Sequence, residues 1–385
     1  MTPGARLQAA IEILDRILQG EAAEKALTGW ARRSRFAGSK DRAAIRDHVF
    51  DAIRCKRSYA ALGGAMTGRG VVIGLARAQG LDLEVLFSGE GHAPAPLSAA
   101  EAAAGRQPEG AEALDLPDWL EPLFRDSLGD RAEEIAQVMK TRAPVMLRVN
   151  LRKGDRGKAI AALREDGIET RPAEISDTAL LVEEGARKVA SSAAFQTGLV
   201  ELQDGASQAV VDALPLEAGM RVLDYCAGGG GKTLAMAGRV EAEFNAHDAN
   251  VARLNDLPSR AKRAGVRVQV LKPGAVTGEF DLVLCDVPCS GSGSWRRAPD
   301  GKWRLTAEKL DELNGIQGDI LETAAALVAP GGILAYATCS VLDRENGDRV
   351  DAFLAAHPDW TETDRRHWLP GPAGDGFFLS CLTRR

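Results

Sequence analysis

The chain has 385 residues, of which 45% are hydrophobic and 26% are charged, and its formal net charge is −6. This length and composition predict a globular protein of two or three domains with a substantial buried core. No apolar stretch approaches the roughly 20 residues that a transmembrane helix needs, and charges interrupt the N-terminal apolar pattern, so we expect a cytoplasmic protein with no membrane partner.

The N-terminal part of the chain is predicted to be helical. Apolar residues recur at helical spacing over 5–19, 24–35 and 39–62. Residues 1–70 hold 13 Lys and Arg against 7 Asp and Glu, whereas residues 71–140 hold 5 against 13. The basic residues of 1–70 could bind phosphates or could form an ordinary solvated surface. The negative net charge of the whole chain argues weakly against nucleic-acid binding.

A small α+β module is expected next. Residues 88–112 are rich in Ala, Gly, Pro and acids and lack an apolar face, which indicates a linker or mobile loop. After a helical pattern at 116–128, strand patterns at 144–151 and 179–184 enclose a helix at 157–167. We therefore divide the chain into a helical domain (1–75), a linker (76–112), a small α+β module (113–200) and a C-terminal domain (201–385).

The C-terminal domain is predicted to be an α/β domain with a Rossmann-like parallel sheet. Helical stretches separate six apolar strands, at 220–228, 242–249, 266–272, 280–287, 331–340 and 376–385. Ligands of such sheets bind beyond the carboxyl ends of the strands, and Cys289 and Cys339 both follow such an end.

A glycine loop, "VLDYCAGGGGKT", joins the first of these strands to a helix. A nucleoside triphosphate loop would need glycine where Cys226 stands, and the dinucleotide fingerprint would need glycine where Thr233 stands. Asp248 ends the next strand 24 residues after Asp224, close to the spacing at which such folds hold a ribose. The pattern suits S-adenosyl-L-methionine, a nucleoside without a polyphosphate, and fits a turn that serves packing alone equally well.

The six cysteines form no C-x-x-C pair, and the five histidines form no ligand pattern, so we expect neither disulfides nor a metal. Two of the thiols suggest covalent catalysis, because a thiolate that adds to C6 of a pyrimidine activates C5 as a nucleophile. Asp286, three residues before Cys289, could neutralise charge on the ring. Either Cys289 or Cys339 could attack, and a single cysteine of this kind is otherwise most often a small buried residue.

A basic aromatic segment follows the first thiol. Trp295 and Trp303 stand among Arg296, Arg297, Lys302 and Arg304. Cations contact phosphates and aromatic rings stack on unpaired bases, so the segment predicts RNA binding, the alternative being a solvated loop with two core tryptophans.

The motifs "DYCAGGGGKT", "DVPCSGSG", "RAPDGKWRL", "NGIQGDIL", "YATCSVLDREN" and "GDGFFLS" together resemble, in order, those of the RNA cytosine-5 methyltransferases of the Nop2/Sun type. The likeness is greatest to the bacterial members that act on small-subunit ribosomal RNA. "LRVNLRKG" and "GLVELQDGASQAVVDAL" are similar to the family's small RNA-binding module and its junction, and the first 70 residues are similar to its NusB-like helical domain.

The resemblance implies a monomeric enzyme that makes 5-methylcytosine in ribosomal RNA. It implies that Cys339 is the nucleophile and that Cys289 assists release of the product. It also implies that Asp286 contacts the target cytosine near the methyl-transfer centre and belongs to the cofactor-binding residues. Asp248 would hold the cofactor ribose. The remaining implied cofactor residues are Cys226, Ala227, Gly228, Gly229, Gly230, Gly231 and Lys232.

Two positions depart from the family pattern. Gly229 stands where a proline is usual, and "LKPG" at 271–274 stands where the family carries an acid, which leaves adenine recognition without a candidate residue. Two alternatives stay open: the same chemistry on transfer RNA, and an RNA-binding assembly factor that has lost catalysis.

Overall fold

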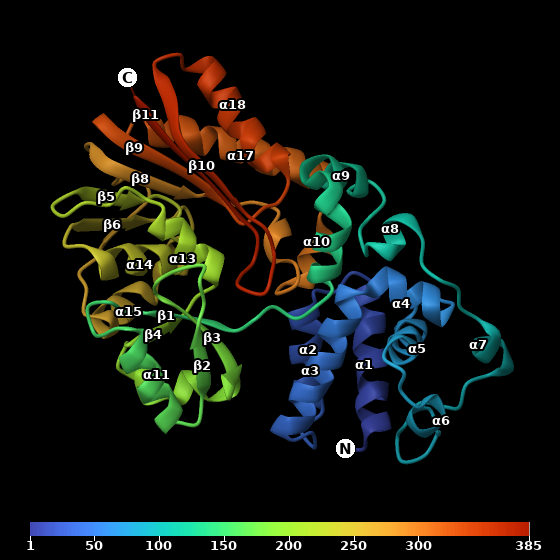
Figure 1. Cartoon of the computed structure of the whole chain (residues 1–385). Helices are drawn as coiled ribbons and strands as arrows, with labels where there is room; N and C mark the ends of the chain where they lie inside the picture. Colours follow the sequence, from blue (N-terminus) through green and yellow to red (C-terminus); the bar gives the residue numbers. More distant parts are fainter. Residues whose placement is uncertain (385) are drawn as a thin grey trace. The chain divides into compact units, whose positions relative to one another are not determined.

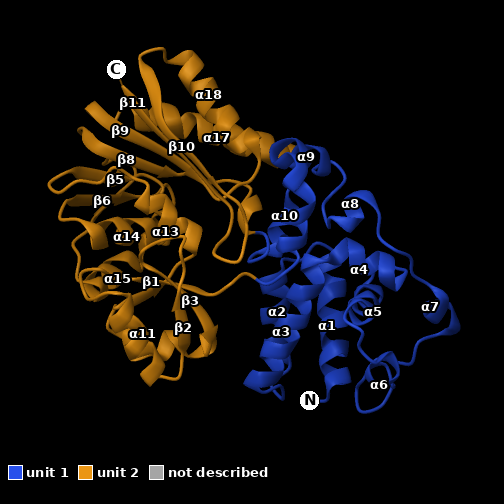
Figure 2. Ribbon diagram, viewed as in Figure 1, with its two compact units in different colours: residues 1–142, 295–305 blue, residues 143–294, 306–385 orange. Residues whose placement is uncertain are grey.

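The computed structural model describes residues 1–384, which divide into two compact units. Unit 1 comprises residues 1–142 and 295–305, and unit 2 comprises residues 143–294 and 306–384 (Figure 2). Unit 1 is built from helices, and unit 2 contains two sheets (Figure 1). No helix among residues 1–384 is both long and apolar enough to cross a membrane.

Unit 1 buries an apolar core between its first five helices. In α1, Leu7, Ala10, Ile11 and Leu14 recur at helical spacing and are all buried, which gives the helix one apolar face. The helices of unit 1 are α1 (Pro3–Leu18), α2 (Ala23–Arg33), α3 (Ser39–Arg54), α4 (Lys56–Gly63), α5 (Gly68–Ala78), α6 (Leu83–Leu86), α7 (Ala99–Ala103), α8 (Gly110–Ala113), α9 (Glu121–Leu128), η1 (Gly129–Arg131), α10 (Ala132–Met139) and α16 (Pro299–Arg304).

The single helix expected over 39–62 is two helices, α3 and α4. A distant side chain caps α4: Asp115 accepts hydrogen bonds from the backbone N–H of Arg57 (2.9 Å) and Ser58 (3.0 Å), and from the Ser58 hydroxyl (2.6 Å). These N–H groups would otherwise lack partners at a helix start. The break therefore depends on a tertiary contact that local periodicity does not contain.

Helix α5 was not expected, because its glycines resemble a loop. They let α5 lie directly against α4: a Cβ on Gly74 would lie 1.8 Å from the Tyr59 carbonyl oxygen. The expected linker, 76–112, carries the short helices α6 and α7 and the buried Phe87, and residues 113–142 cluster with unit 1. The division into four domains stays a prediction.

The smaller sheet of unit 2 has four antiparallel strands in the order β2-β3-β1-β4. Its strands are β1 (Met146–Val149), β2 (Glu169–Pro172), β3 (Ala179–Glu184) and β4 (Val200–Leu202), and its helices are α11 (Arg156–Glu165), η2 (Ala186–Ser191) and α12 (Ala193–Gln196). Leu163 of α11 packs with Leu147 and Leu180 in its core. The expected strands and helix are present, whereas β2 and β4 are too short and polar to give a strand pattern.

The larger sheet has seven strands in the order β10-β11-β9-β8-β5-β6-β7. The five strands from β7 to β9 are parallel, and β11 and β10 pair antiparallel, so the expected parallel sheet is a mixed one. The strands are β5 (Arg221–Asp224), β6 (Glu243–His247), β7 (Gln269–Leu271), β8 (Phe280–Asp286), β9 (Val328–Thr338), β10 (Trp360–Trp368) and β11 (Phe377–Arg384). The exposed, charged β10 was not expected.

Helices cover both faces of this sheet (Figure 1). Leu282 and Leu284 of β8 pack with α13 and α14, whereas Val283 and Cys285 pack with α17 and α18. Burial on both faces explains why residues 282–285 of β8 form an unbroken apolar run. The helices around the sheet are α13 (Gly205–Asp212), α14 (Gly231–Arg239), η3 (Val251–Leu254), α15 (Leu257–Ala264), η4 (Ser292–Ser294), α17 (Ala307–Ala325), η5 (Asp343–Glu345) and α18 (Gly347–Ala356).

Candidate active site

A cavity of about 760 Å³ opens in unit 2 at the carboxyl ends of β5, β6, β8 and β9. Ligands of parallel α/β sheets bind at this edge. The lining includes every residue predicted for catalysis or cofactor binding except Gly230, namely Cys226, Ala227, Gly228, Gly229, Gly231, Lys232, Asp248, Asp286, Cys289 and Cys339. Residues 271–274, where the family acid is absent, do not contribute to the lining.

The glycine loop turns sharply between β5 and α14. Gly228 and Gly230 have φ of 55° and 77°, a region that residues with a Cβ rarely adopt. A Cβ on Gly230 would also lie 2.3 Å from a methyl carbon of Leu257. Arg148 of β1 donates to the Gly231 carbonyl oxygen (2.8 Å), so the smaller sheet helps to hold the loop.

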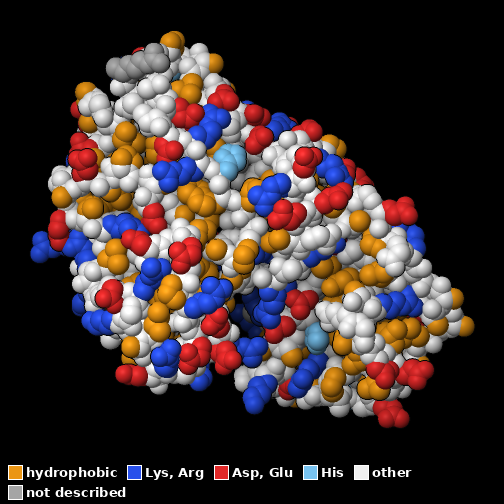
Figure 3. Space-filling view, viewed as in Figure 1, with side chains coloured by type: hydrophobic (Ala, Val, Ile, Leu, Met, Phe, Trp, Pro, Cys, Tyr) orange, Lys and Arg blue, Asp and Glu red, His pale blue; other side chains and the backbone are white. Residues whose placement is uncertain are grey.

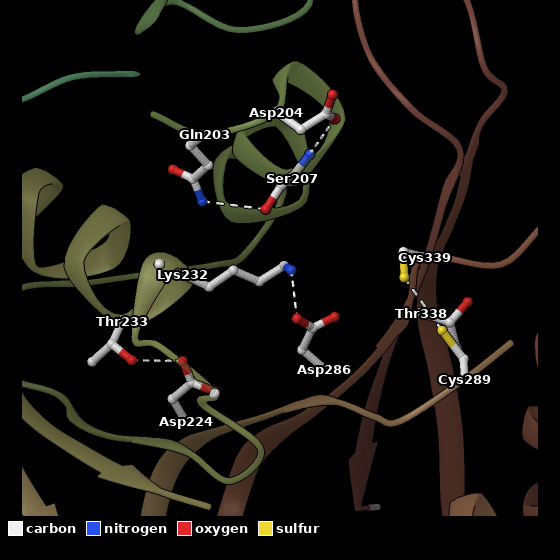
Figure 4. Close-up of polar contacts among 12 residues, drawn as sticks. Gln203, Asp204, Ser207, Asp224, Lys232, Thr233, Asp286, Cys289, Thr338 and Cys339 are labelled. Carbon is white, nitrogen blue, oxygen red and sulfur yellow. Dashed lines mark hydrogen bonds and ion pairs between the residues drawn. The ribbon is translucent and has the colours of Figure 1, made fainter. Parts of the chain in front are cut away.

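Asp224 ends β5 and is 1% exposed. Burial raises the pKa of Asp224 to about 7, although the Thr233 hydroxyl, which donates to its Oδ2 at 2.6 Å, opposes that rise (Figure 4). Its other oxygen, Oδ1, is buried without a hydrogen-bond partner among the described residues. A buried acceptor of this kind at a cavity is suited to a donor group on a ligand.

Asp248 follows β6, and the loop holds its carboxylate in place. Oδ2 accepts from the Gly228 N–H (2.8 Å) and from Arg253 (3.2 Å), and Oδ1 accepts from the Asn250 N–H (2.9 Å). The side chain is buried but lines the cavity. Nothing in the sequence indicated a role for Arg253 and Asn250, which line the cavity beside Asp248.

Lys232 and Asp286 form an ion pair in the cavity. The Lys232 side chain extends from the start of α14, and its Nζ lies 2.6 Å from Oδ2 of Asp286 at the end of β8 (Figure 4). Burial pulls the pKa of Lys232 down, but the facing Asp286 carboxylate outweighs it and raises that pKa, so Lys232 is a cation at neutral pH.

The two predicted thiols point toward one another, with 3.4 Å between their sulfur atoms (Figure 4). The hydrogen bond from Cys289 lowers the pKa of Cys339, and together with Lys232 and Ser294 it outweighs burial and the Asp286 carboxylate, which both raise that pKa. The same hydrogen bond, burial and the Glu345 carboxylate raise the pKa of Cys289 well above its usual range. The pKa of Cys339 is lowered and that of Cys289 is raised, so Cys339 is the thiol of the pair that loses its proton more readily, with Cys289 as the hydrogen-bond donor.

A buried polar network joins the two cysteine loops. Glu345, which is 0% exposed, accepts from the Ser290 N–H (2.8 Å), the Ser340 hydroxyl (2.5 Å) and Gln317 Nε2 (3.1 Å). Gln317 also donates to the Pro288 carbonyl oxygen (3.0 Å). One carboxylate thus fixes the residues that follow both Cys289 and Cys339. The motifs "NGIQGDIL" and "DREN" contain Gln317 and Glu345, but nothing in the sequence indicated this role.

The basic aromatic segment is divided between buried and exposed side chains. Arg296 and Lys302 are each 2% exposed, and Lys302 donates to the Arg54 carbonyl oxygen of α3 at 3.3 Å. Trp303 donates to the Ile53 carbonyl oxygen at 2.7 Å and packs on the helical core of unit 1. Only Arg297 and Arg304 of the four predicted RNA-binding cations are exposed.

The described residues contain no cluster of three or more His, Cys, Asp or Glu side chains that could hold a metal ion. All six cysteines are free thiols. In the cavity, Lys232 is hydrogen-bonded to Asp286 and Cys289 to Cys339, and side chains of these types are suited to nucleophilic attack and proton transfer.

Two protein-family models match the chain. The model described as "16S rRNA methyltransferase RsmB/F" matches residues 211–380, and the model described as "Methyltr_RsmF/B-like, ferredoxin-like domain" matches residues 116–189. The first covers both thiols and the glycine loop, and the second covers most of the smaller sheet.

Curated proteins and a solved structure are similar to the chain. It is 34% identical over 287 residues to ribosomal RNA small subunit methyltransferase B of Klebsiella pneumoniae (strain 342), which covers 70% of this chain and 66% of that protein. It is 35% identical over 288 residues to the protein of the same name from Xylella fastidiosa (strain 9a5c), and this match covers 70% of this chain and 68% of that protein. The chain thus spans about two thirds of the length of these relatives. The crystal structure of PH0851 has a TM-score of 0.78 at 24% identity, covers 100% of this chain and 99% of that one, and shows the fold alone.

Proposed function

The chain belongs to the RsmB/F family of 16S rRNA methyltransferases, and from this premise we propose that it methylates C5 of a cytosine in small-subunit ribosomal RNA. S-adenosyl-L-methionine is the methyl donor in this proposal. The observation that carries it is a pair of thiols with opposite pKa shifts, which line the same cavity as a glycine loop.

The cavity suits the proposed cofactor. Its volume of about 760 Å³ is within the range of small-molecule sites. Oδ1 of Asp224, buried without a partner among the described residues, would accept from the methionine ammonium group. Asp248 would accept from the ribose hydroxyls, and the loop backbone of Gly228 and Gly229 allows close approach. When bound, the cofactor supplies an electrophilic methyl group.

Attack begins at Cys339 in this mechanism. Its thiolate adds to C6 of the cytosine, and the electron pair of the C5–C6 double bond moves onto C5, which then takes the methyl group. Asp286 and Lys232, 2.6 Å apart, offer an acceptor and a proton donor to the N3 and N4 edge of the base, where charge builds.

Release then falls to Cys289. The hydrogen bond to the Cys339 thiolate is the largest cause of the raised pKa of Cys289, and that thiolate is consumed when the adduct forms. The pKa of Cys289 then falls, so this thiol can lose its proton to water and accept the proton of C5. The C5–C6 double bond re-forms, the C6–sulfur bond breaks, and its electron pair returns to Cys339.

RNA binding outside the cavity forms a further part of the proposal. We assign phosphate contacts to the exposed Arg297 and Arg304 and place Arg296 and Lys302, both buried, in support of their segment. The N-terminal helices are proposed to be a NusB-like domain, and the protein to act as a monomer.

The proposal is tested by incubating the full chain with S-adenosyl-L-methionine and a 16S rRNA transcript and measuring 5-methylcytosine by mass spectrometry. Bisulfite sequencing then locates the site, and a Cys339→Ala variant serves as the inactive control. A product in transfer RNA and none in 16S rRNA would exclude the proposed substrate. If calorimetry detected no binding of S-adenosyl-L-methionine at millimolar concentration, the protein would be an RNA-binding assembly factor instead.

A further inference from the structure

The turn between α2 and α3 carries the most exposed large apolar side chain of unit 1, surrounded by cations. Phe36 is 76% exposed. Five further side chains of residues 32–42, which we call the α2–α3 turn, are exposed and basic: Arg32, Arg33, Arg35, Lys40 and Arg42. In Figure 3, Lys and Arg side chains gather at the lower end of α2 and α3.

The cations of the α2–α3 turn form no ion pairs with the described part of the chain. None of the five has an acidic partner among residues 1–384, and Asp41, the acid within the turn, is engaged by Arg6 (2.9 Å) and the N-terminal ammonium (3.3 Å). Elsewhere in unit 1 exposed arginines pair with acids, as Arg106 does with Glu112 and Arg131 with Glu134. The turn is therefore a concentrated, uncompensated positive charge on a chain whose net charge is −6.

The backbone of the turn is fixed from within, so Phe36 is not a displaced core residue. Ser34 and Ala37 on either side are 7% and 3% exposed, and the Ala37 N–H donates to the Ser34 carbonyl oxygen at 3.0 Å. The side chain between them is thus directed outward. Helix α3 begins in the same turn without a side-chain cap, which adds the positive end of its dipole to the site.

We propose that the α2–α3 turn is a docking site for single-stranded RNA, separate from the active-site cavity. The cations contact successive phosphates, and Phe36 stacks on an unpaired base. The positive charge of the turn favours a polyanion as the partner. The exposed Phe36 ring favours a single strand, whose bases are free to stack, over a duplex. The inference rests on the proposed function only for its partner, the RNA substrate.

Binding of a fluorescent single-stranded oligouridine of about 12 nucleotides to the full chain tests the site, with fluorescence anisotropy as the readout. We expect Phe36→Ala to weaken binding roughly 5- to 150-fold, which corresponds to about 1–3 kcal/mol for one stacked base. Affinity for a duplex of the same length should not change. Val85→Ala is the matched control, because Val85 is 66% exposed on α6 of the same unit.

The triple variant R32A/R33A/R35A tests the charges. Each phosphate contact contributes about 0.7 to the slope of log affinity against log salt for a single strand, so the slope should fall by about 2. The triple variant R106A/R125A/R131A removes three arginines that are paired with glutamates and should leave the slope unchanged. Thermal unfolding checks that each variant is folded.

Equal affinities and equal slopes in the turn variants and the unsubstituted protein would overturn the proposal. The same result is expected if the turn binds a ribosomal protein or a membrane instead of RNA. Methyl transfer to 16S rRNA by the unsubstituted protein, measured alongside, separates the two ideas. A protein that methylates 16S rRNA but is insensitive to changes in the turn keeps the proposed function and loses only this site.

Discussion

Replacing Cys289 with alanine should slow the formation of the covalent RNA adduct and also cause the adduct to accumulate. The variant removes the thiol that donates to Cys339 across 3.4 Å, and it removes the group that we assign to product release. Adduct should therefore form more slowly at neutral pH but accumulate, because the step that frees Cys339 is lost.

The retardation follows from the hydrogen bond. This bond is the largest cause of the lowered pKa of Cys339. A hydrogen bond to a charged group is worth about 1.5–3 kcal/mol, so its loss should raise the pKa of Cys339 and lower the thiolate population at neutral pH roughly 10- to 150-fold. Because the thiolate is the reactive form, adduct formation rises with pH through this pKa, and in the variant the rise occurs at higher pH.

The assay is the initial rate of formation of a retarded protein–RNA band on a denaturing gel, measured from pH 6 to pH 10. Cys339→Ala should give no band at any pH. An adduct that requires Cys289 and persists in Cys339→Ala would reverse the two roles. An unchanged pH midpoint in Cys289→Ala would show that the hydrogen bond does not set the pKa of Cys339.

Three further substitutions probe the groups around the thiols. Lys232→Met removes the cation that lowers the pKa of Cys339, so the midpoint of adduct formation should again move to higher pH on the same gel. Glu345→Ala leaves several buried donors without an acceptor and should lower the free energy of unfolding by roughly 2–5 kcal/mol in urea, whereas Glu345→Gln, which keeps one acceptor oxygen, should lose less. Gly230→Ala should cost about 1–3 kcal/mol of stability, because its φ is 77° and a Cβ would lie 2.3 Å from Leu257. It should also weaken S-adenosyl-L-methionine binding in calorimetry, and an unchanged dissociation constant would contradict a cofactor role for the loop.

The strands that position the site could be predicted because their patterns are local. The apolar run of β8 ends at Asp286 and that of β9 ends just before Cys339, and parallel strands bring these ends to one edge of a sheet. Helix α5 could not be predicted in this way. Its glycines resemble a loop unless the carbonyl oxygen of Tyr59, which they accommodate, is known to lie opposite.

Residue type and spacing predicted the candidate reacting groups, which line one cavity, but not the network that orients them. Cys339, Cys289 and Asp286 stand in recognisable motifs, whereas Glu345 functions through contacts with Ser290, 55 residues away. A buried carboxylate with several donors is costly unless all of its partners are in place. The role of Glu345 can be recognised only in the folded structure, where the loops after Cys289 and Cys339 lie together.

The basic segment after Cys289 shows how charge in a sequence can mislead about a surface. Four cations with two tryptophans are a typical RNA-binding pattern, yet Arg296 and Lys302 are buried, and Lys302 donates to the end of α3. Burial lowers the pKa of Lys302 to about 8, because it disfavours the charged form of the side chain. A lysine that contacts RNA at the surface does not need such burial. The cations of the α2–α3 turn give the opposite case. They lie in an ordinary helical pattern, and only the absence of acidic partners among residues 1–384, together with the exposed Phe36, distinguishes them from a solvated helix end.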